Sequence, residues 1–201
     1  MGGEFFDLFS KEDKVFMMMS ATSSYLASSS ILQLFTELRA LESFSETDEI
    51  TFIEKVKEQI QTLTQSQGKE VKAQIFTCIL DVKTLKISGH VFGNFKMISS
   101  DIKSNKEFSH SLDIDFEQAK FTRKIKRGER IMFCSPGFMM NWSGLNPKFM
   151  IEELMTNKKI KVLDILDEVF FQVKKDSESG FLKSDASSII MEVQENVILE
   201  M

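Results

Sequence analysis

The pattern of hydrophobic and polar positions divides the chain into blocks of strands and helices. The first block predicts strands: an aromatic segment at 4–9, a polar turn, and a continuous apolar run at 14–19 that is typical of a strand buried on both faces. Apolar residues then recur at spacings of three and four. This period predicts one amphipathic helix over about 23–42 and a second helix over about 47–65. Thr47 and Asp48 are the candidate caps at the start of the second helix, and the segment ending in Gly68 is expected to stop it.

Residues 71–135 show no helical period, and their short apolar segments are separated by turn signals. The strands expected in this block cover about 72–82, 84–92, 95–100, 119–125 and 130–135. Tight turns are expected at Asp81–Thr84 and at Arg127–Glu129, and Pro136 and Gly137 close the last of these strands. Such a run of consecutive strands is typical of antiparallel sheets.

The C-terminal block predicts a short helix at about 147–156, a longer helix at about 159–174 and strand-like segments at 187–193 and 197–199. The longer helix is expected to turn inward Val162, Leu163, Leu166, Val169, Phe170 and Val173. Together the blocks predict an α+β fold, a sandwich of two packed antiparallel sheets flanked by helices, as a single domain over 1–201. The strands are too consecutive for a doubly wound parallel sheet.

Composition narrows the class of protein. Of the 201 residues, 42% are hydrophobic and 27% charged, which is the balance of a globular domain, and the net charge of −5 disfavours nucleic acid or an anionic membrane as a partner. The longest wholly apolar run, Val15–Met19, is too short to cross a bilayer, and its methionines are expected in the core. The start of the chain lacks the features of a signal peptide. Cys78 and Cys134 lie in separate apolar runs, so we expect reduced core thiols in a cytoplasmic protein.

Five short segments follow one another in an order that is informative as a set. They are Gly2–Asp7, Val15–Ser24, Ile87–His90, Lys126–Gly137 and Ser184–Ile190. In this order, and with helices in the gaps between them, they resemble the motifs of the SpoIIE-like branch of the PPM-type metal-dependent protein serine/threonine phosphatases. The resemblance covers essentially the whole chain. It implies a fold of two packed antiparallel sheets flanked by helices, as the pattern alone predicts.

The resemblance also implies a chemistry, namely phosphoester hydrolysis by a water held between two Mg²⁺ or Mn²⁺ ions. In the family, aspartates within these motifs bind the ions, because hard cations prefer carboxylate oxygens. The corresponding positions here are Glu4, Ala21, Pro136 and Ser184, and Asp185 stands beside the last of them. Glu4 and Asp185 are therefore the remnant metal ligands that the resemblance leaves.

The loss of carboxylates decides the leading hypothesis. Two divalent ions about 4 Å apart repel each other by roughly 16 kcal/mol at an effective dielectric constant near 20. Two carboxylates do not offset this repulsion, so we expect no paired metal centre, no bound cofactor and no metal-dependent catalysis. The leading hypothesis is a pseudophosphatase that acts as a signalling or partner-binding module.

Two other readings stay open. One is an active Mn- or Mg-dependent serine/threonine phosphatase with non-standard ligands, which would hold up to two ions and dephosphorylate a small regulatory protein. The other is a structural domain whose activity belongs to a neighbouring segment outside this chain. The partners implied by the resemblance are a phosphorylated or unphosphorylated regulatory protein of a partner-switching system, or a second copy of the chain in a homodimer. Nucleic acid and membrane insertion are not expected.

Three further features carry alternatives. The family has a flap near the substrate where this chain has Phe138, Met139, Met140 and Trp142, and these residues either bury against the sandwich or form a partner-binding patch. The basic segment 123–130 is expected to face water at a strand edge rather than to bind phosphate. His90 is expected to be structural.

Overall fold

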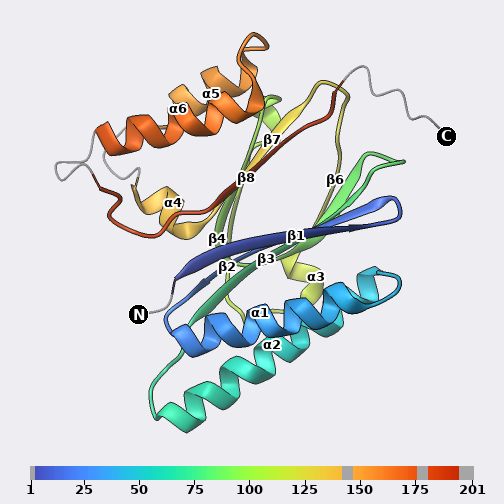
Figure 1. The fold of residues 1–201 in the computed structure, drawn as a ribbon, viewed down its shortest axis with the longest axis vertical. Coiled ribbons are helices and arrows are strands. Elements are labelled where there is room, and N and C mark those ends of the chain that lie inside the picture. Colours follow the sequence, from blue (N-terminus) through green and yellow to red (C-terminus); the bar gives the residue numbers. More distant parts are fainter. Residues whose placement is uncertain (1–2, 142–146, 176–180, 195–201) are drawn as a thin grey trace. The chain divides into compact units, whose positions relative to one another are not determined.

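The structure is a computed structural model that describes residues 3–141, 147–175 and 181–194, with the side chains of 147–149 excepted (Figure 1). Its contacts divide the chain into two compact units. Unit 1 comprises Met1–Asn94 with Phe108–Lys124, and unit 2 comprises Phe95–Glu107 with Ile125–Met201. We describe each unit by itself.

Unit 1 is built on an antiparallel sheet in the strand order β1-β2-β3-β4-β6. Its strands are β1 (Glu4–Lys11), β2 (Lys14–Thr22), β3 (Ala73–Asp81), the first part of β4 (Lys86–Ser99) and β6 (Lys120–Lys124). The apolar run predicted as a doubly buried strand is the centre of β2, where Met17, Met18 and Met19 are at most 4% exposed. The sequence therefore predicted this strand and its burial correctly.

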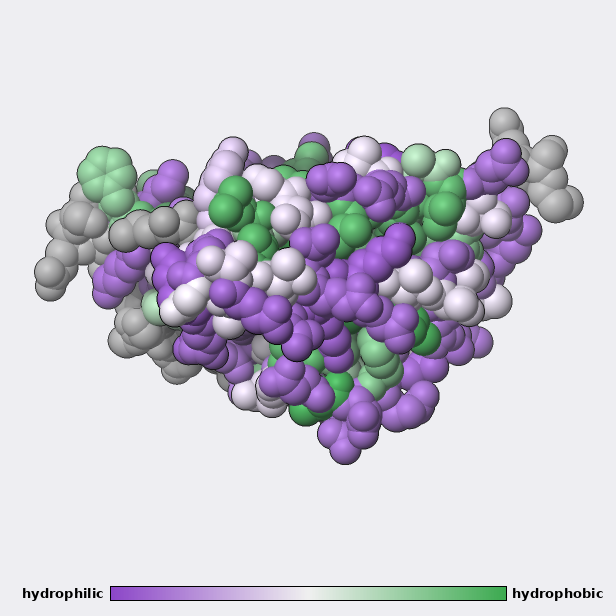
Figure 2. Space-filling view, turned by 90° about the horizontal axis from the view of Figure 1, so that it is seen from below, coloured by the Kyte–Doolittle hydropathy of each residue, from purple (hydrophilic) through white to green (hydrophobic). Residues whose placement is uncertain are grey.

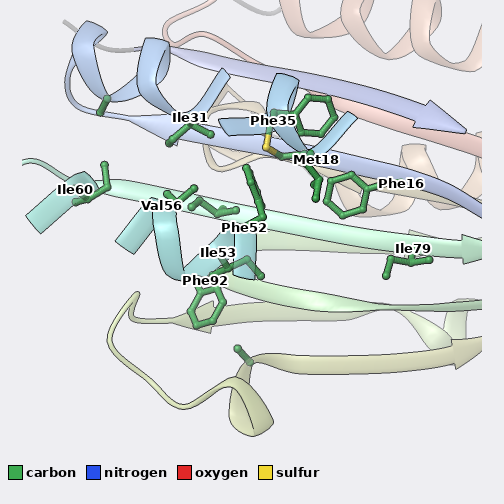
Figure 3. Close-up of a cluster of buried hydrophobic side chains, with 14 of the residues drawn as sticks. Phe16, Met18, Ile31, Phe35, Phe52, Ile53, Val56, Ile60, Ile79 and Phe92 are labelled. Atoms are coloured by element: carbon green, nitrogen blue, oxygen red, sulfur yellow. The ribbon is translucent and has the colours of Figure 1, made fainter. Parts of the chain in front are cut away.

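Two helices, α1 (Tyr25–Ala40) and α2 (Glu46–Gln67), lie side by side along one face of this sheet (Figure 1). Their apolar stripes meet the sheet in a cluster of aromatic rings, part of which is shown in Figure 3. Neighbouring ring centroids in the cluster lie 4.8–6.4 Å apart and belong to Phe9, Phe16, Phe35, Phe44 and Phe52. Burying each such side chain contributes about 1.5–3 kcal/mol, so these rings stabilise unit 1 strongly.

The residues that cap α2 agree with the sequence-based expectation at the end of the helix but not at its start. Gly68, expected to stop the helix, is its C-cap in the left-handed conformation, with φ at 63°. At the start, the expectation of Thr47 as a cap was wrong. Ser45 is the N-cap, its hydroxyl accepts from the Asp48 N–H, and the Asp48 carboxylate accepts from the Ser45 N–H at 2.8 Å. This reciprocal capping box fixes the helix start two residues earlier.

The structure has one strand, β4 (Lys86–Ser99), where the sequence predicted two, at about 84–92 and 95–100. Gly93 lies in the gap between the two predicted strands. Its φ of 130° is one that few other residues adopt, and a Cβ there would lie 2.5 Å from the Gln74 Cβ. Between residues 101 and 119, where the pattern predicted no element, the structure has η1 (Ile102–Ser104), β5 (Lys106–His110), which pairs with β4, and α3 (Phe116–Ala119).

Unit 2 contains the end of β4, β7 (Arg130–Cys134) and β8 (Ser188–Glu192), paired antiparallel in that order. Its longer helices are α5 (Pro147–Thr156) and α6 (Val162–Lys175), and the short helix α4 (Pro136–Asn141) was not predicted. Their buried side chains pack with the strands in a core made by Ile98, Met132, Cys134, Phe138, Ile151, Met155, Ile165, Val169 and Val173.

One inward residue of α6 was assigned wrongly. Leu163 is 76% exposed, and Ile165 is buried in its place. The buried positions 165, 169 and 173 define the inner side of the helix, and Leu163 lies about 200° around the axis from Ile165.

Each unit therefore carries antiparallel strands covered by helices, and the α+β prediction is confirmed. Cys78 and Cys134 are free and buried, as expected. Within the described ranges, no helix combines the length and apolar character that crossing a membrane requires. The expected strand at 197–199 lies outside the described residues.

Candidate functional site

The first two family ligand positions lie opposite each other in unit 1. Glu4 on β1 pairs with Ala21 on β2, and Ala21 pairs in turn with Gln74 on β3. Directly opposite residues point to the same face of a sheet, with Cβ atoms about 5 Å apart. The row therefore presents one half-buried carboxylate, one methyl group and one amide, whose oxygen already accepts from the Asn94 N–H at 2.6 Å.

A shift of one residue along β2 adds no ligand. Ser20 lies on the opposite face of the strand and is 1% exposed. The hydroxyl of Thr22 donates to the Ser24 carbonyl at 3.0 Å and lies 2.6 Å from the Ser28 hydroxyl. It is thus engaged at the start of α1. At this end of unit 1, Glu4 is the only acid among the family positions.

The other two family positions lie in unit 2. Pro136 is the first residue of α4 and is separated from β7 by Ser135, and Ser184 lies four residues before the start of β8. The segments that carry them are joined by Ser135, whose N–H donates to the Ser187 carbonyl at 3.0 Å and whose hydroxyl accepts from the Ser187 N–H at 3.0 Å. These bonds join the segment that carries Pro136 to the segment that carries Ser184.

Asn141, at the end of α4, makes a second connection between the same segments. Its amide NH₂ donates to the Gly137 carbonyl at 2.8 Å and to the Ser184 carbonyl at 2.9 Å. Its amide oxygen accepts from the N–H groups of Lys183 at 2.6 Å and Ser184 at 3.2 Å. We call these four bonds the Asn141 clasp. An uncharged side chain thus holds the backbone that carries Pro136 and Ser184.

The electrostatics of these positions are poor for a cation pair. Asp185 is exposed and Ser184 half-buried. Among the described residues, no group of three or more His, Cys, Asp or Glu side chains is arranged to hold a metal ion. From the four family positions and their neighbours, each unit contributes one carboxylate, Glu4 in unit 1 and Asp185 in unit 2. A single carboxylate is a sparse donor set for hard divalent cations, which take several oxygen ligands.

The residues at the place of the family's flap differ in how exposed their side chains are. Phe138 is 1% exposed, and its ring packs edge-on against Phe170 with centroids 5.6 Å apart. Met139 is half-buried against the same core, whereas Met140 is 61% exposed. Trp142 lies outside the described residues. Of this set, Met140 is the side chain that is exposed in the described part of the chain.

The basic segment 123–130 does not face water throughout, because Arg130 is 2% exposed. Its guanidinium donates to the Glu192 carboxylate at 3.0 Å and to the carbonyls of Asn157 at 2.9 Å and Ile160 at 2.6 Å. It joins β7 to β8 and to the turn after α5. The expectation of a solvated segment was wrong at this residue, because its planar fork of donors satisfies several acceptors at once.

Sequence reasoning missed a buried polar cluster in unit 1. Glu49 on α2, Thr77 on β3 and His90 on β4 are 0%, 0% and 1% exposed. The His90 Nδ1 atom lies 3.2 Å from Glu49 Oε1, and the Thr77 hydroxyl donates to the same oxygen. A signal was available, because Glu49 continues the buried stripe of Ile53, Val56 and Ile60 at helical spacing.

A groove of about 1060 Å³ also lies within unit 1, between α2, the start of β3 and residues 109–113. Amide and hydroxyl side chains line much of it. Within the lining, Gln74 accepts from the Asn94 N–H, and the Asn94 side chain accepts from the Ser109 hydroxyl at 2.9 Å. Lys57 lines the groove with its ammonium 4.3 Å from the centre of the Phe92 ring, and burial lowers its pKa. Ile60, Val71, Ala73 and Leu112 add apolar side chains, so the lining is mixed. Hydrophilic and hydrophobic residues are likewise interspersed on the face of the molecule drawn in Figure 2.

Comparison with known proteins agrees on the fold. No protein-family model matches the sequence, and no curated protein matches it. The PP2C phosphatase domain of SpoIIE from Bacillus subtilis, solved with a fragment of its regulatory domain, is 14% identical, with 94% of this chain covered and a TM-score of 0.71. The chain spans 57% of the length of that structure.

Two other solved structures are similar. RsbX in complex with magnesium is 10% identical, with 94% of this chain and 86% of that chain covered and a TM-score of 0.61. The SiaA-PP2C domain of Pseudomonas aeruginosa is 9% identical, with 95% and 80% covered and a TM-score of 0.71. At these identities the likeness shows the fold and not the activity. The chain has the fold of the PP2C/PPM phosphatase domains, as SpoIIE does.

Proposed function

We propose that this domain is a pseudophosphatase, a PPM-fold module that binds a signalling protein and does not hydrolyse phosphoesters through a pair of metal ions. One observation carries the proposal. Three of the four family ligand positions, Ala21, Pro136 and Ser184, carry no carboxylate.

Charge balance gives this observation its weight. Two divalent ions carry four positive charges, whereas the family positions and their neighbours keep one carboxylate in unit 1, Glu4, and one in unit 2, Asp185. The repulsion between the ions, about 16 kcal/mol at an effective dielectric constant near 20, is left largely uncompensated. A water between two ions, the nucleophile of this chemistry, therefore has no site at which to form.

The Asn141 clasp supports the same conclusion. In unit 2, the backbone at Pro136 and Ser184 is joined by neutral hydrogen bonds through Ser135 and Asn141. These bonds need no cation, so this part of the fold is complete without one.

The partner we propose is a phosphorylated or unphosphorylated regulatory protein of a partner-switching system, with a second copy of the chain as the alternative. The groove beside α2 and the exposed Met140 are the described surfaces we assign to such contacts. A cytoplasmic setting, in which Cys78 and Cys134 stay reduced, accords with this role.

Metal titration tests the loss of catalysis. We expect calorimetric titration with MnCl₂ or MgCl₂ to show no pair of sites at micromolar concentration, and we expect no hydrolysis of a phosphoserine peptide. A triple variant, Ala21→Asp, Pro136→Asp and Ser184→Asp, should gain two-metal binding because it restores the missing carboxylates.

The matched control is a second triple variant, Ser29→Asp, Thr122→Asp and Thr156→Asp, which adds the same charge at exposed positions. It should gain no metal affinity. Two Mn²⁺ bound per wild-type chain together with peptide hydrolysis would establish instead an active phosphatase with non-standard ligands. A folded restoring variant that binds no better than its control would show that the motifs are misplaced.

A further inference from the structure

The outer edge of β1 is not used by the proposed function. Among the described strands, β1 stands first in the order of the sheet and pairs with β2 alone. The Thr22 N–H donates to the Gly3 carbonyl at 3.1 Å, just before β1 begins. Bonded and non-bonded pairs alternate along antiparallel strands, so the odd-numbered residues of β1 bond to β2 and the even-numbered residues direct their N–H and C=O groups outward. Such a row of backbone groups is a template for another strand.

The apolar side chains along this edge complement a second copy of the same strand. Phe6 and Leu8 are 53% and 47% exposed. Two copies of β1 can pair antiparallel through their outward groups in a register that sets Phe6 opposite Leu8 of the second copy. The same register sets Phe5 opposite Phe9 of the second copy. Aromatic and apolar side chains directly opposite each other stabilise a pair of strands.

Asp7 and Arg39 occupy the middle of this edge. The Leu8 N–H donates to Asp7 Oδ1 at 2.7 Å, and the Arg39 guanidinium donates to the Leu8 carbonyl at 3.1 Å and to Asp7 Oδ1 at 2.6 Å. Both outward backbone groups of Leu8 therefore have partners within the chain. The ring of Phe35 helps to hold the guanidinium, because its centroid lies 5.3 Å from the Arg39 Cζ.

The charge of Asp7 opposes pairing as well. In the register that matches the apolar side chains, Asp7 lies opposite Asp7 of the second copy, and like charges directly opposite each other are destabilising. The side chains of Arg39 and Asp7 are 45% and 36% exposed, so their ion pair adds little to the stability of the fold. Its place matters more than its strength, since a charge in the middle of an edge strand discourages edge-to-edge association.

We propose that the edge of β1 is a strand-pairing surface that fits the same edge of a second copy of this chain, and that Asp7 and Arg39 hold this surface closed. Pairing requires both side chains to leave the backbone groups of Leu8, and it requires this in both copies. Removal of the two side chains opens the surface.

Sedimentation equilibrium tests the proposal on the wild type and on the double variant Asp7→Thr/Arg39→Ala, which removes both partners of Leu8. We expect the double variant to self-associate at least about tenfold more tightly than the wild type, because no side-chain hydrogen bond has to be broken in either copy. The control is Asp13→Ser/Lys83→Ala, which removes another exposed ion pair with the same change of charge. It should associate as the wild type does. Equal association of the double variant and the control would overturn the proposal.

Adding Leu8→Pro to the double variant locates the association. The Leu8 N–H points outward, so proline removes a donor that pairing needs and leaves the bonds to β2 in place. Association should return to the wild-type level, and association that survives would overturn the proposal by placing it on another surface. Should the double variant fail to fold, Arg39→Ala alone frees the Leu8 carbonyl and replaces it. Should the proline variant fail to fold, Leu8→Lys replaces it, because lysine also blocks a strand edge.

Discussion

The Asn141 side chain connects two segments of unit 2 through the hydrogen bonds of the Asn141 clasp. Its amide uses both its donors and its acceptor oxygen on backbone groups of α4 and of residues 183–184, and it is 8% exposed. A buried amide with this many partners is costly to remove, because every partner is left without a bond.

We therefore predict that Asn141→Ala lowers the free energy of unfolding by about 3 kcal/mol. Asn157→Ala is the control, because Asn157 is exposed and its side chain accepts a single bond, from the Lys159 N–H at 3.0 Å. Urea denaturation followed by circular dichroism measures both. If the two variants lose the same stability, the clasp does not contribute as described.

Gly89 gives a second prediction at this scale. It lies opposite Cys78 in the sheet, and a Cβ there would be 2.0 Å from the Thr77 carbonyl oxygen. Gly89→Ala should cost at least about 3 kcal/mol, because backbone must shift to admit the methyl group. Gly68→Ala should cost only about 1 kcal/mol, since the site is open and the penalty is a left-handed φ of 63°. Comparable thermal unfolding midpoints for the two variants would contradict this difference.

At the scale of single residues, the sequence shows which residue occupies each family position. It does not show how deeply a given side chain is buried. The resemblance assigned Glu4, Ala21, Pro136 and Ser184 to the family positions, and only the structure shows that Glu4 lies opposite Ala21 in the sheet. It did not predict a buried Glu49, because an acidic residue at the start of a helix is usually read as an exposed first-turn charge.

Elements were predictable where a period was long. Helix α2 repeats its apolar stripe over 22 residues, so its existence was plain from the sequence. Helix α4 has six residues and begins at Pro136, which reads as a strand terminator, so no period was available. Strand β5 depends on its pairing with β4, a long-range contact that local pattern does not contain.

The capping box of α2 gives the prediction at this scale. Ser45→Ala removes the hydroxyl that accepts from the Asp48 N–H, and it should cost about 1 kcal/mol. Ser29→Ala, at an exposed position inside α1, should leave stability unchanged or slightly raised, because alanine favours helix. Thermal denaturation compares them, and a neutral Ser45→Ala would mean that α2 is held by packing alone.

For the whole molecule, the two cysteines report separately on the two units. Cys78 lies in unit 1 and Cys134 in unit 2, both are free and 0% exposed, and burial raises the pKa of each thiol. The reactive thiolate is thus suppressed twice, by access and by protonation.

We predict that both thiols react with a disulfide reagent at least about 1,000-fold more slowly in the native protein than in urea. Single variants Cys78→Ala and Cys134→Ala assign the two rates. Because exchange requires opening, the assigned rates also measure how readily each unit opens. Fast labelling of either thiol in the native protein would contradict the burial of that thiol.

The strand β4 has a consequence for changes of chain length. Its residues 86–92 pair with β3 and β6, and its residues 96–99 pair with β7, along one continuous backbone. Side chains alternate between the two faces of a strand, so the face that one residue occupies fixes the faces of the residues that follow it. One additional residue placed after Asn94 would leave Val91 and Phe92 on their present faces of the strand. It would move Met97 and Ile98 to the opposite face. Evolution can lengthen this chain between Ser99 and Lys106 far more readily than it can at the middle of β4.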